Sequence, residues 1–135
     1  MKITVETTIA APLQKVWSAW ITPADIVQWN AASDDWHTPS ARVDLRVGGD
    51  FSWRMEARDG SMGFDFEGVY TAVEPEKLIA YRMADGREVT VEFIPSGSDA
   101  RVRETFDAET MHSPEQQREG WQAILDRFAR HVSGG

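Results

Sequence analysis

Apolar and polar residues alternate along most of this chain, and the alternation predicts β-strands. Near the N-terminus, Ile3, Val5 and Ile9 are separated by polar residues, a pattern typical of a strand with one buried face. The same pattern predicts six further strands, at residues 41–47, 50–57, 64–73, 78–83, 89–93 and 102–106. Short turns such as Gly48-Gly49 and Asp85-Gly86 separate neighbouring strands, so we expect an antiparallel sheet.

Two short helices are predicted between the first and second strands. Pro12 suits the first position of one helix, and Thr22 followed by Pro23 marks the start of the other. The stretch 30–39 that follows is expected to be a loop, although it contains Trp36. A tryptophan in a polar loop indicates a cavity mouth, a partner interface or a plug in the core.

The last part of the chain predicts one long amphipathic helix. Ser113 and Gln116 have the spacing of a capping box. One face of the helix is apolar and carries Trp121, Ile124, Leu125, Phe128 and Val132. A helix of about 20 residues is about 30 Å long and can cross a small sheet, which favours a cavity between the two. Gly120 within this helix indicates either a gap for a ligand or close packing against another element.

These elements together predict an α+β protein. Its order is one strand, two short helices, six further strands of an antiparallel sheet and a long C-terminal helix. Residues 1–132 are expected to form a single domain. Residues 133–135 are expected to form a disordered tail.

Charge and composition exclude several classes of function. The net charge of −8 repels phosphate backbones, so no nucleic-acid partner is expected. No stretch resembles a membrane span or a signal peptide, and the lack of cysteine fits the cytoplasm. The spacing of His37, His112 and His131 predicts no metal site, and the glycine-containing turns predict no phosphate or cofactor site.

Several short motifs also follow one another in a characteristic order. They are Ile9-Ala10-Ala11-Pro12-Leu13-Gln14-Lys15-Val16-Trp17, Thr22-Pro23 leading to Gln28-Trp29, Arg46-Val47-Gly48-Gly49, Val73-Glu74-Pro75-Glu76-Lys77-Leu78, and Gly120-Trp121 through Leu125. This series resembles the START/polyketide-cyclase helix-grip superfamily. The ending is similar to one branch of it, the homologues of the C-terminal domain of the heat-shock-protein-90 ATPase activator.

The resemblance implies the helix-grip fold, in which a seven-stranded curved antiparallel sheet wraps around a long C-terminal helix, with two short helices between strands 1 and 2. It also implies a set of functions to consider. Members of the superfamily bind lipids, sterols, polyketides or plant hormones, and some catalyse cyclisation. The branch implies a chaperone as a candidate partner. A small hydrophobic molecule is the other expected partner, and the resemblance leaves monomer and homodimer open.

The candidate polar anchors are Glu104 and Arg82. Glu104 lies between Val102 and Phe106 and shares their face, so its carboxylate is expected to point inward. A buried carboxylate needs a neighbouring cation or a raised pKa. Arg82, which shares a face with Leu78 and Ala80 on the strand at residues 78–83, is the candidate partner. The alternative is that both strands fray and both groups are solvated.

The candidate lining of the cavity is mostly aromatic. The expected residues are Trp53, Met55, Phe66, Tyr81, Phe93 and Trp121, for which ordinary core packing is the alternative. Gln117 falls within the apolar stripe of the long helix, where it either bonds a ligand or lies in water near the helix end.

Three functional hypotheses follow. The first is binding of a small hydrophobic or aromatic ligand in the cavity. The second is an enzyme that acts on such a ligand in cyclase-like or hydrolase-like chemistry, with Glu104 as general acid or base. The third is a protein-interaction module that modulates a chaperone ATPase and presents an exposed apolar patch near Trp36.

Overall fold

The structure, a computed structural model, describes residues 1–134. It contains one sheet and three helices. The elements in chain order are β1 (Lys2–Ile9), α1 (Leu13–Ile21), α2 (Pro23–Trp29), β2 (Trp36–Val43), β3 (Asp50–Ala57), β4 (Gly63–Glu74), β5 (Leu78–Met83), β6 (Glu88–Ser96), β7 (Asp99–Asp107) and α3 (Pro114–Gly134).

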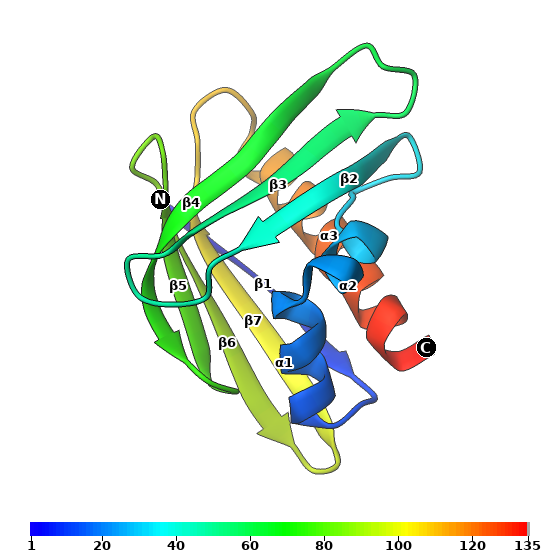
Figure 1. Ribbon diagram of the computed structural model, residues 1–135, viewed down its shortest axis with the longest axis vertical. Coiled ribbons are helices and arrows are strands. Elements are labelled where there is room, and N and C mark those ends of the chain that lie inside the picture. The colour runs from blue at the N-terminus through cyan, green and yellow to red at the C-terminus, as the bar shows by residue number, and fades with distance from the viewer. Residues whose placement is uncertain (135) are drawn as a thin grey trace.

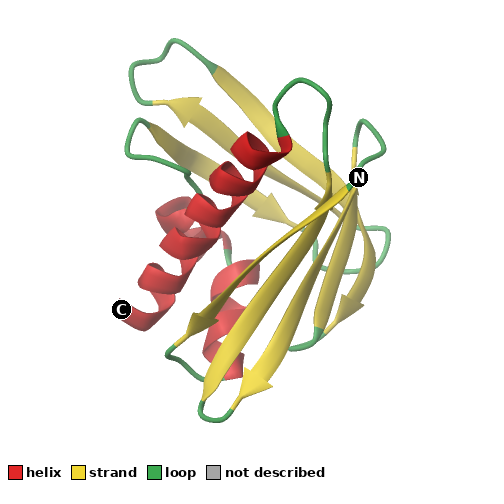
Figure 2. Cartoon of the chain, turned by 180° about the vertical axis from the view of Figure 1, so that it is seen from behind, coloured by secondary structure: helices red, strands yellow, loops and turns green. Residues whose placement is uncertain are grey.

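The seven strands form one antiparallel sheet in the order β1-β7-β6-β5-β4-β3-β2. The sheet curls, and all three helices lie on its concave side (Figure 1). Figure 2 shows α3 passing across this side, with the strands curving behind it. The predicted α+β class and the helix-grip arrangement are therefore confirmed.

The strand that follows the two short helices begins earlier than its sequence pattern predicts. β2 starts at Trp36, which pairs with Ala57 of β3, and it ends at Val43 rather than at residue 47. The sequence obscures this strand because Pro39 interrupts it. The pairing register shifts between His37 and Ser40, and β2 lies at the edge of the sheet, where a proline is tolerated.

The long helix begins at the predicted cap. The backbone N–H of Gln116 donates to Ser113 Oγ at 3.1 Å, and the N–H of Ser113 donates to Gln116 Oε1 at 3.1 Å, which confirms the capping box. At its other end the helix continues through Ser133 and Gly134, so these two residues are not a disordered tail as predicted. Gly135, the last residue of that predicted tail, lies outside the described residues.

The main core lies between the concave face of the sheet and the helices. Alternate residues of β7 point into it, so Val102, Glu104 and Phe106 are all buried. Leu125 and Phe128 of α3 are buried from the other side. The alternation that predicts the strands thus also brings one carboxylic acid into the apolar interior.

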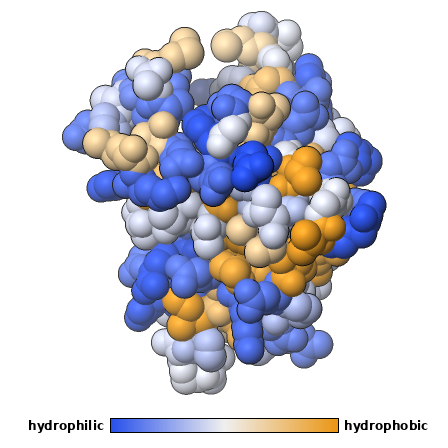
Figure 3. Space-filling view, turned by 90° about the vertical axis from the view of Figure 1, so that its left-hand side faces the viewer, coloured by the Kyte–Doolittle hydropathy of each residue, from blue (hydrophilic) through white to orange (hydrophobic). Residues whose placement is uncertain are grey.

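The convex face of the sheet is largely polar, with scattered apolar side chains. Figure 3 views the molecule from the side of β4 and β5, where apolar groups gather between charged ones. Val69 of β4 is 45% exposed. Arg82 of β5 is exposed as well, and its Nη2 donates to Glu88 Oε1 at 3.2 Å.

Candidate functional site

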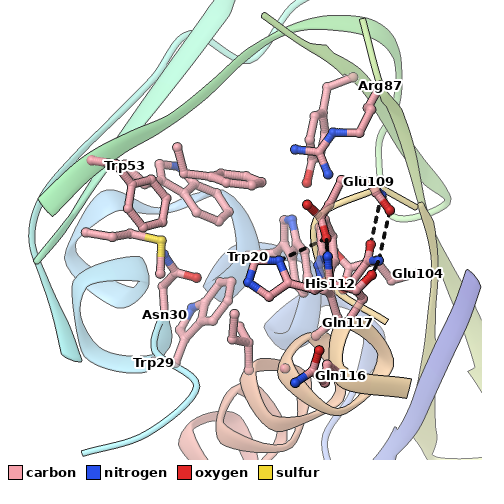
Figure 4. Close-up of a pocket in the computed structure, with 17 residues that line it drawn as sticks. Trp20, Trp29, Asn30, Trp53, Arg87, Glu104, Glu109, His112, Gln116 and Gln117 are labelled. Atoms are coloured by element: carbon pink, nitrogen blue, oxygen red, sulfur yellow. Dashed lines mark hydrogen bonds and ion pairs between the residues drawn. The ribbon is translucent and has the colours of Figure 1, made fainter. Parts of the chain in front are cut away.

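A cavity of about 420 Å³ lies between the concave face of the sheet and α3 (Figure 4). This volume is within the usual range for small-molecule sites. The cavity is lined by Trp20, Trp29, Asn30, Trp53, Met55, Phe64, Phe66, Tyr81, Arg87, Glu104, Glu109, His112, Gln116, Gln117, Gly120, Trp121 and Ile124. The lining residues come from all three helices and from the strands β3, β4, β5 and β7. The others lie in the segments that follow α2 and β5 and in the loop before α3.

Aromatic rings form most of the cavity wall and brace one another. Trp53 and Phe66 lie on paired positions of β3 and β4, with ring centroids 5.7 Å apart. Phe66 also meets Tyr81 at 6.1 Å and Trp121 of α3 at 6.2 Å, both edge to face. Such packed rings make a rigid apolar surface suited to a flat or hydrophobic ligand.

Glu104 is the buried acid of this cavity. Its pairing partners on the neighbouring strands are Val5 and Val91, so it is flanked by apolar side chains, and it is only 6% exposed. Burial raises the pKa of Glu104 to about 8. At neutral pH the group is therefore mostly a neutral carboxylic acid that can donate a hydrogen bond.

Tyr81 and Arg87 add polar groups to the same cavity. Burial raises the pKa of Tyr81 well above its usual value, and the nearby Glu104 raises it further. Arg87 follows the hairpin turn after β5, and its Nε donates to Asp85 Oδ2 at 2.7 Å. Arg87 remains the one guanidinium among the lining residues in the described part of the chain.

The loop before α3 closes one end of the cavity and is held by Gln117. The Gln117 side-chain amide donates to the backbone carbonyls of Glu109 and His112, and its Oε1 accepts from the Glu109 N–H at 2.9 Å. The Glu109 carboxylate in turn accepts from the backbone N–H groups of Met111 and His112. Gln117 lines the cavity, but its amide is already engaged by the loop rather than free for a ligand or dissolved in water.

Gly120 leaves space where α3 faces the cavity. A Cβ atom at this position would meet no atom within 4 Å. Close packing against another element therefore does not explain this glycine. Its presence in the middle of a helix enlarges the cavity instead.

Seven of the nine residues expected at the site line the cavity. They are Trp53, Met55, Phe66, Tyr81, Glu104, Gln117 and Trp121. Phe93 points inward but is covered by α1, where Trp17 meets it edge to face at 5.1 Å. It is part of the core rather than of the cavity.

Arg82 is the second residue that does not reach the cavity, and the prediction that it anchors Glu104 is wrong. In β5 the inward residues are Ile79, Tyr81 and Met83, so Arg82 lies on the convex face. Leu78 and Ala80 lie on the same face of β5 as Arg82. Because these two residues are apolar, the sequence pattern predicted that this face is buried. Arg87, five residues further along, is the arginine that lines the cavity.

The sequence reading missed several lining residues. Trp20 belongs to α1, Asn30 directly follows α2, and Glu109 and His112 lie in the loop before α3, where no strand alternation indicates direction. Trp36, in contrast, is outside the cavity lining. It is half-buried on β2, with its ring centroid 5.9 Å from that of the exposed Phe64.

The family model for Activator of Hsp90 ATPase homolog 1-like protein matches residues 10–133. The chain belongs to this family. The match extends from the end of β1 to the last turn of α3, and so it includes every residue that lines the cavity.

Solved structures agree with this membership. The AHSA1-like protein from Aeromonas hydrophila is 52% identical, with a TM-score of 0.93 over 99% of this chain and 93% of that one. A protein from Cytophaga hutchinsonii is 46% identical, with a TM-score of 0.86 over 98% and 92% of the two chains. A protein from Nitrosomonas europaea shares the fold at 21% identity and a TM-score of 0.84, over 99% and 95%. Comparison with the curated proteins found no match.

Two further features bear on partners and cofactors. None of the helices within residues 1–134 is long and apolar enough to span a membrane. In the same part of the chain, histidine and carboxylate side chains do not gather in threes or more at a point where a metal ion could bind.

Proposed function

We propose that this protein binds a small hydrophobic or aromatic molecule in the cavity between the sheet and α3. The observation that carries the proposal is an aromatic cavity of about 420 Å³ containing a buried acid, Glu104, that is neutral at neutral pH. Proteins of this fold family commonly bind hydrophobic ligands, which supports the proposal. The lack of cysteine fits a reducing compartment, so the proposed site of action is the cytoplasm.

Two features make a permanently empty cavity an unfavourable arrangement. Burying Glu104 costs free energy, and the pKa near 8 reports that cost. Glycine at position 120 lowers helix propensity without relieving any close contact. Both features would be eliminated in a protein selected for stability alone, and both are explained if the cavity holds a ligand.

Thermal unfolding against a panel of ligands tests the proposal. The panel contains fatty acids, sterols, flavonoids and aromatic acids. A ligand at 100 times its dissociation constant adds about 2.7 kcal/mol, which raises the midpoint of a domain of this size by roughly 10 °C. A panel without any shift would contradict binding of these classes.

The pKa of Glu104 also favours a second candidate function, an enzyme that acts on the bound molecule. A general acid works best when its pKa is near the working pH, and a value of about 8 meets this condition. Under this hypothesis Glu104→Gln keeps ligand binding and loses turnover. Equal turnover in the wild type and in Glu104→Gln would exclude Glu104 as the catalytic acid or base.

A further inference from the structure

Tyr81 and Glu104 converge on the cavity from two strands that are not neighbours. Tyr81 of β5 pairs with Val89 of β6, and Glu104 of β7 pairs with Val91 of the same strand. One strand therefore separates them. Because Tyr81 is opposite Val89 and Glu104 is opposite Val91, their positions are also offset by two residues, so the two Cα atoms would lie about 12 Å apart in a flat sheet. Both side chains face the concave side of the sheet and line the same cavity. The negative charge that Glu104 carries when ionised raises the pKa of Tyr81, in keeping with their shared cavity.

Within the part of the chain that the structure describes, neither of these two polar groups is engaged by another protein group. Among residues 1–134, hydrogen bonding contributes nothing to the pKa of Tyr81 or to that of Glu104. Among the side-chain nitrogen and oxygen atoms of residues 1–134, only Trp53 Nε1 is both fully enclosed and without a hydrogen-bond partner. The oxygen atoms of Tyr81 and Glu104 are therefore not fully enclosed. The hydroxyl and the carboxyl are thus open to the cavity that both residues line.

Both groups are hydrogen-bond donors at neutral pH. Tyr81 keeps its proton because burial disfavours the phenolate, and Glu104 keeps its proton because burial disfavours the carboxylate. A tyrosine hydroxyl beside a protonated carboxylic acid in an apolar site is an arrangement that stabilises negative charge on an oxygen atom.

The acceptor that fits two converging donors is a carbonyl oxygen, because it has two lone pairs in one plane. Figure 4 shows Trp53 across the cavity from Glu104, which agrees with the separation of β3 and β7 by three strands. The space between them is bounded by aromatic rings, among them Phe66 and Trp121. A flat ring system therefore fits the apolar part of the cavity while its carbonyl group faces the donors.

We propose that the Tyr81 hydroxyl and the Glu104 carboxyl together hold the carbonyl oxygen of a flat aromatic ketone. This inference rests on the proposed function and names the chemical class of the ligand. The two donors form the polar end of the site, and the aromatic rings hold the remainder of the molecule. Because both donors are neutral, they bind a carbonyl oxygen without leaving a buried ionic charge unpaired.

Two probes of nearly equal shape test the inference. One is 2-acetylnaphthalene, and the other is 2-isopropenylnaphthalene, in which a CH₂ group replaces the carbonyl oxygen. Titration calorimetry of the wild-type protein is expected to give at least about tenfold tighter binding of the ketone, which corresponds to about 1.4 kcal/mol. In Tyr81→Phe and in Glu104→Leu the preference is expected to fall to about twofold or less. The exposed control Arg82→Gln keeps the full preference.

The outcomes separate the two proposals. Equal binding of both probes by the wild type overturns the carbonyl clamp and leaves the hydrophobic site intact. Binding of neither probe overturns the clamp and counts against the proposed function for aromatic ligands. A ketone preference that survives in both Tyr81→Phe and Glu104→Leu also overturns the clamp.

Infrared spectroscopy of the bound ketone provides a measurement that needs no variant. Carbon-13 in the carbonyl group separates its stretching band from the protein bands. Two hydrogen bonds from the cavity are expected to move the band to lower frequency than in an apolar solvent. A band at the apolar-solvent frequency in the wild-type complex overturns the inference.

Discussion

The ring of Trp121 on α3 stacks on the ring of Phe106 on β7, with centroids 3.9 Å apart and planes 9° from parallel. Phe106 follows Glu104 by two residues and faces the same side of the sheet. The stack therefore fixes the long helix against the strand that carries the buried acid. Trp121 lines the cavity and Phe106 lies in the core behind it, so the stack couples the stability of the fold to the shape of the site.

A double-mutant cycle measures this stacking. Trp121→Leu is expected to lower the free energy of unfolding by about 1–3 kcal/mol, because it removes ring contact at a partly buried position. Combined with Phe106→Leu, the cycle is expected to give a coupling energy of about 0.5–1.5 kcal/mol in urea unfolding. Additive single effects would show that the two rings do not stabilise each other.

The raised pKa of Glu104 predicts how stability depends on pH. The pKa rises from its ordinary value of 4.5 to about 8 on folding, so between these values the folded state holds a proton that the unfolded state has lost. Stability is expected to fall as pH rises through this window, with a slope of up to about 1.4 kcal/mol per pH unit, and to level off above it. Tyr81, Arg87, Glu109 and His112 are the other titratable groups that line the cavity.

Glu104→Gln is the matched variant for this prediction. It keeps the shape of the side chain and removes the titration, so its unfolding free energy is expected to lose this slope. Below about pH 4.5 the two proteins are expected to be similarly stable, and above about pH 8 the variant is expected to be the more stable one. Chemical unfolding at a series of pH values measures both curves. A slope that is unchanged in the variant would assign the pH dependence to other groups.

The amide of Gln117 predicts the behaviour of the loop before α3. Gln117→Leu removes three hydrogen bonds to the backbone of Glu109 and His112 and is expected to destabilise the fold by about 1–3 kcal/mol. Hydrogen exchange of the loop amides is expected to quicken more than exchange in β7. Gln116→Ala is the control. It removes the bond from the Ser113 N–H to Gln116 Oε1, one of the two capping bonds, and is expected to cost about 1 kcal/mol or less while the Glu109 amide stays protected. Equal loop protection in Gln117→Leu and the wild type would contradict this role.

The open space at Gly120 predicts opposite effects on stability and on binding. Gly120→Ala is expected to stabilise the protein by up to about 1 kcal/mol, because alanine favours the helix and its Cβ meets nothing. Gly120→Phe places a ring in the cavity and is expected to abolish the thermal shift caused by 2-acetylnaphthalene. A full shift in Gly120→Phe would place the bound probe elsewhere on the molecule.

The fold could be predicted largely from the sequence, because strand alternation and turn residues are local signals. The inward direction of Glu104 followed from the same alternation, since Val102 and Phe106 on either side are strongly apolar. Local alternation did not resolve β5, where both faces carry apolar residues. There the direction of Arg82 depends on pairing with β4 and β6, which is a property of the whole sheet.

Other parts of the site depend on how elements pack rather than on any local pattern. Phe93 points inward as predicted, but α1 lies over it and removes it from the cavity. Gln117 was found in the apolar stripe of the helix, yet its amide bonds to a loop that the sequence does not position. Trp36 belongs to the edge strand β2, which is paired with β3 on both sides of the register shift near Pro39.

The most direct test of the central claim uses the indole N–H signals of the six tryptophans. Four of these residues, Trp20, Trp29, Trp53 and Trp121, line the cavity, whereas Trp17 and Trp36 do not. Titration of ¹⁵N-labelled protein with 2-acetylnaphthalene is expected to shift the signals of the four lining residues and to leave those of Trp17 and Trp36 nearly unchanged. Unchanged signals from the four, or shifts confined to Trp17 and Trp36, would contradict ligand binding in this cavity.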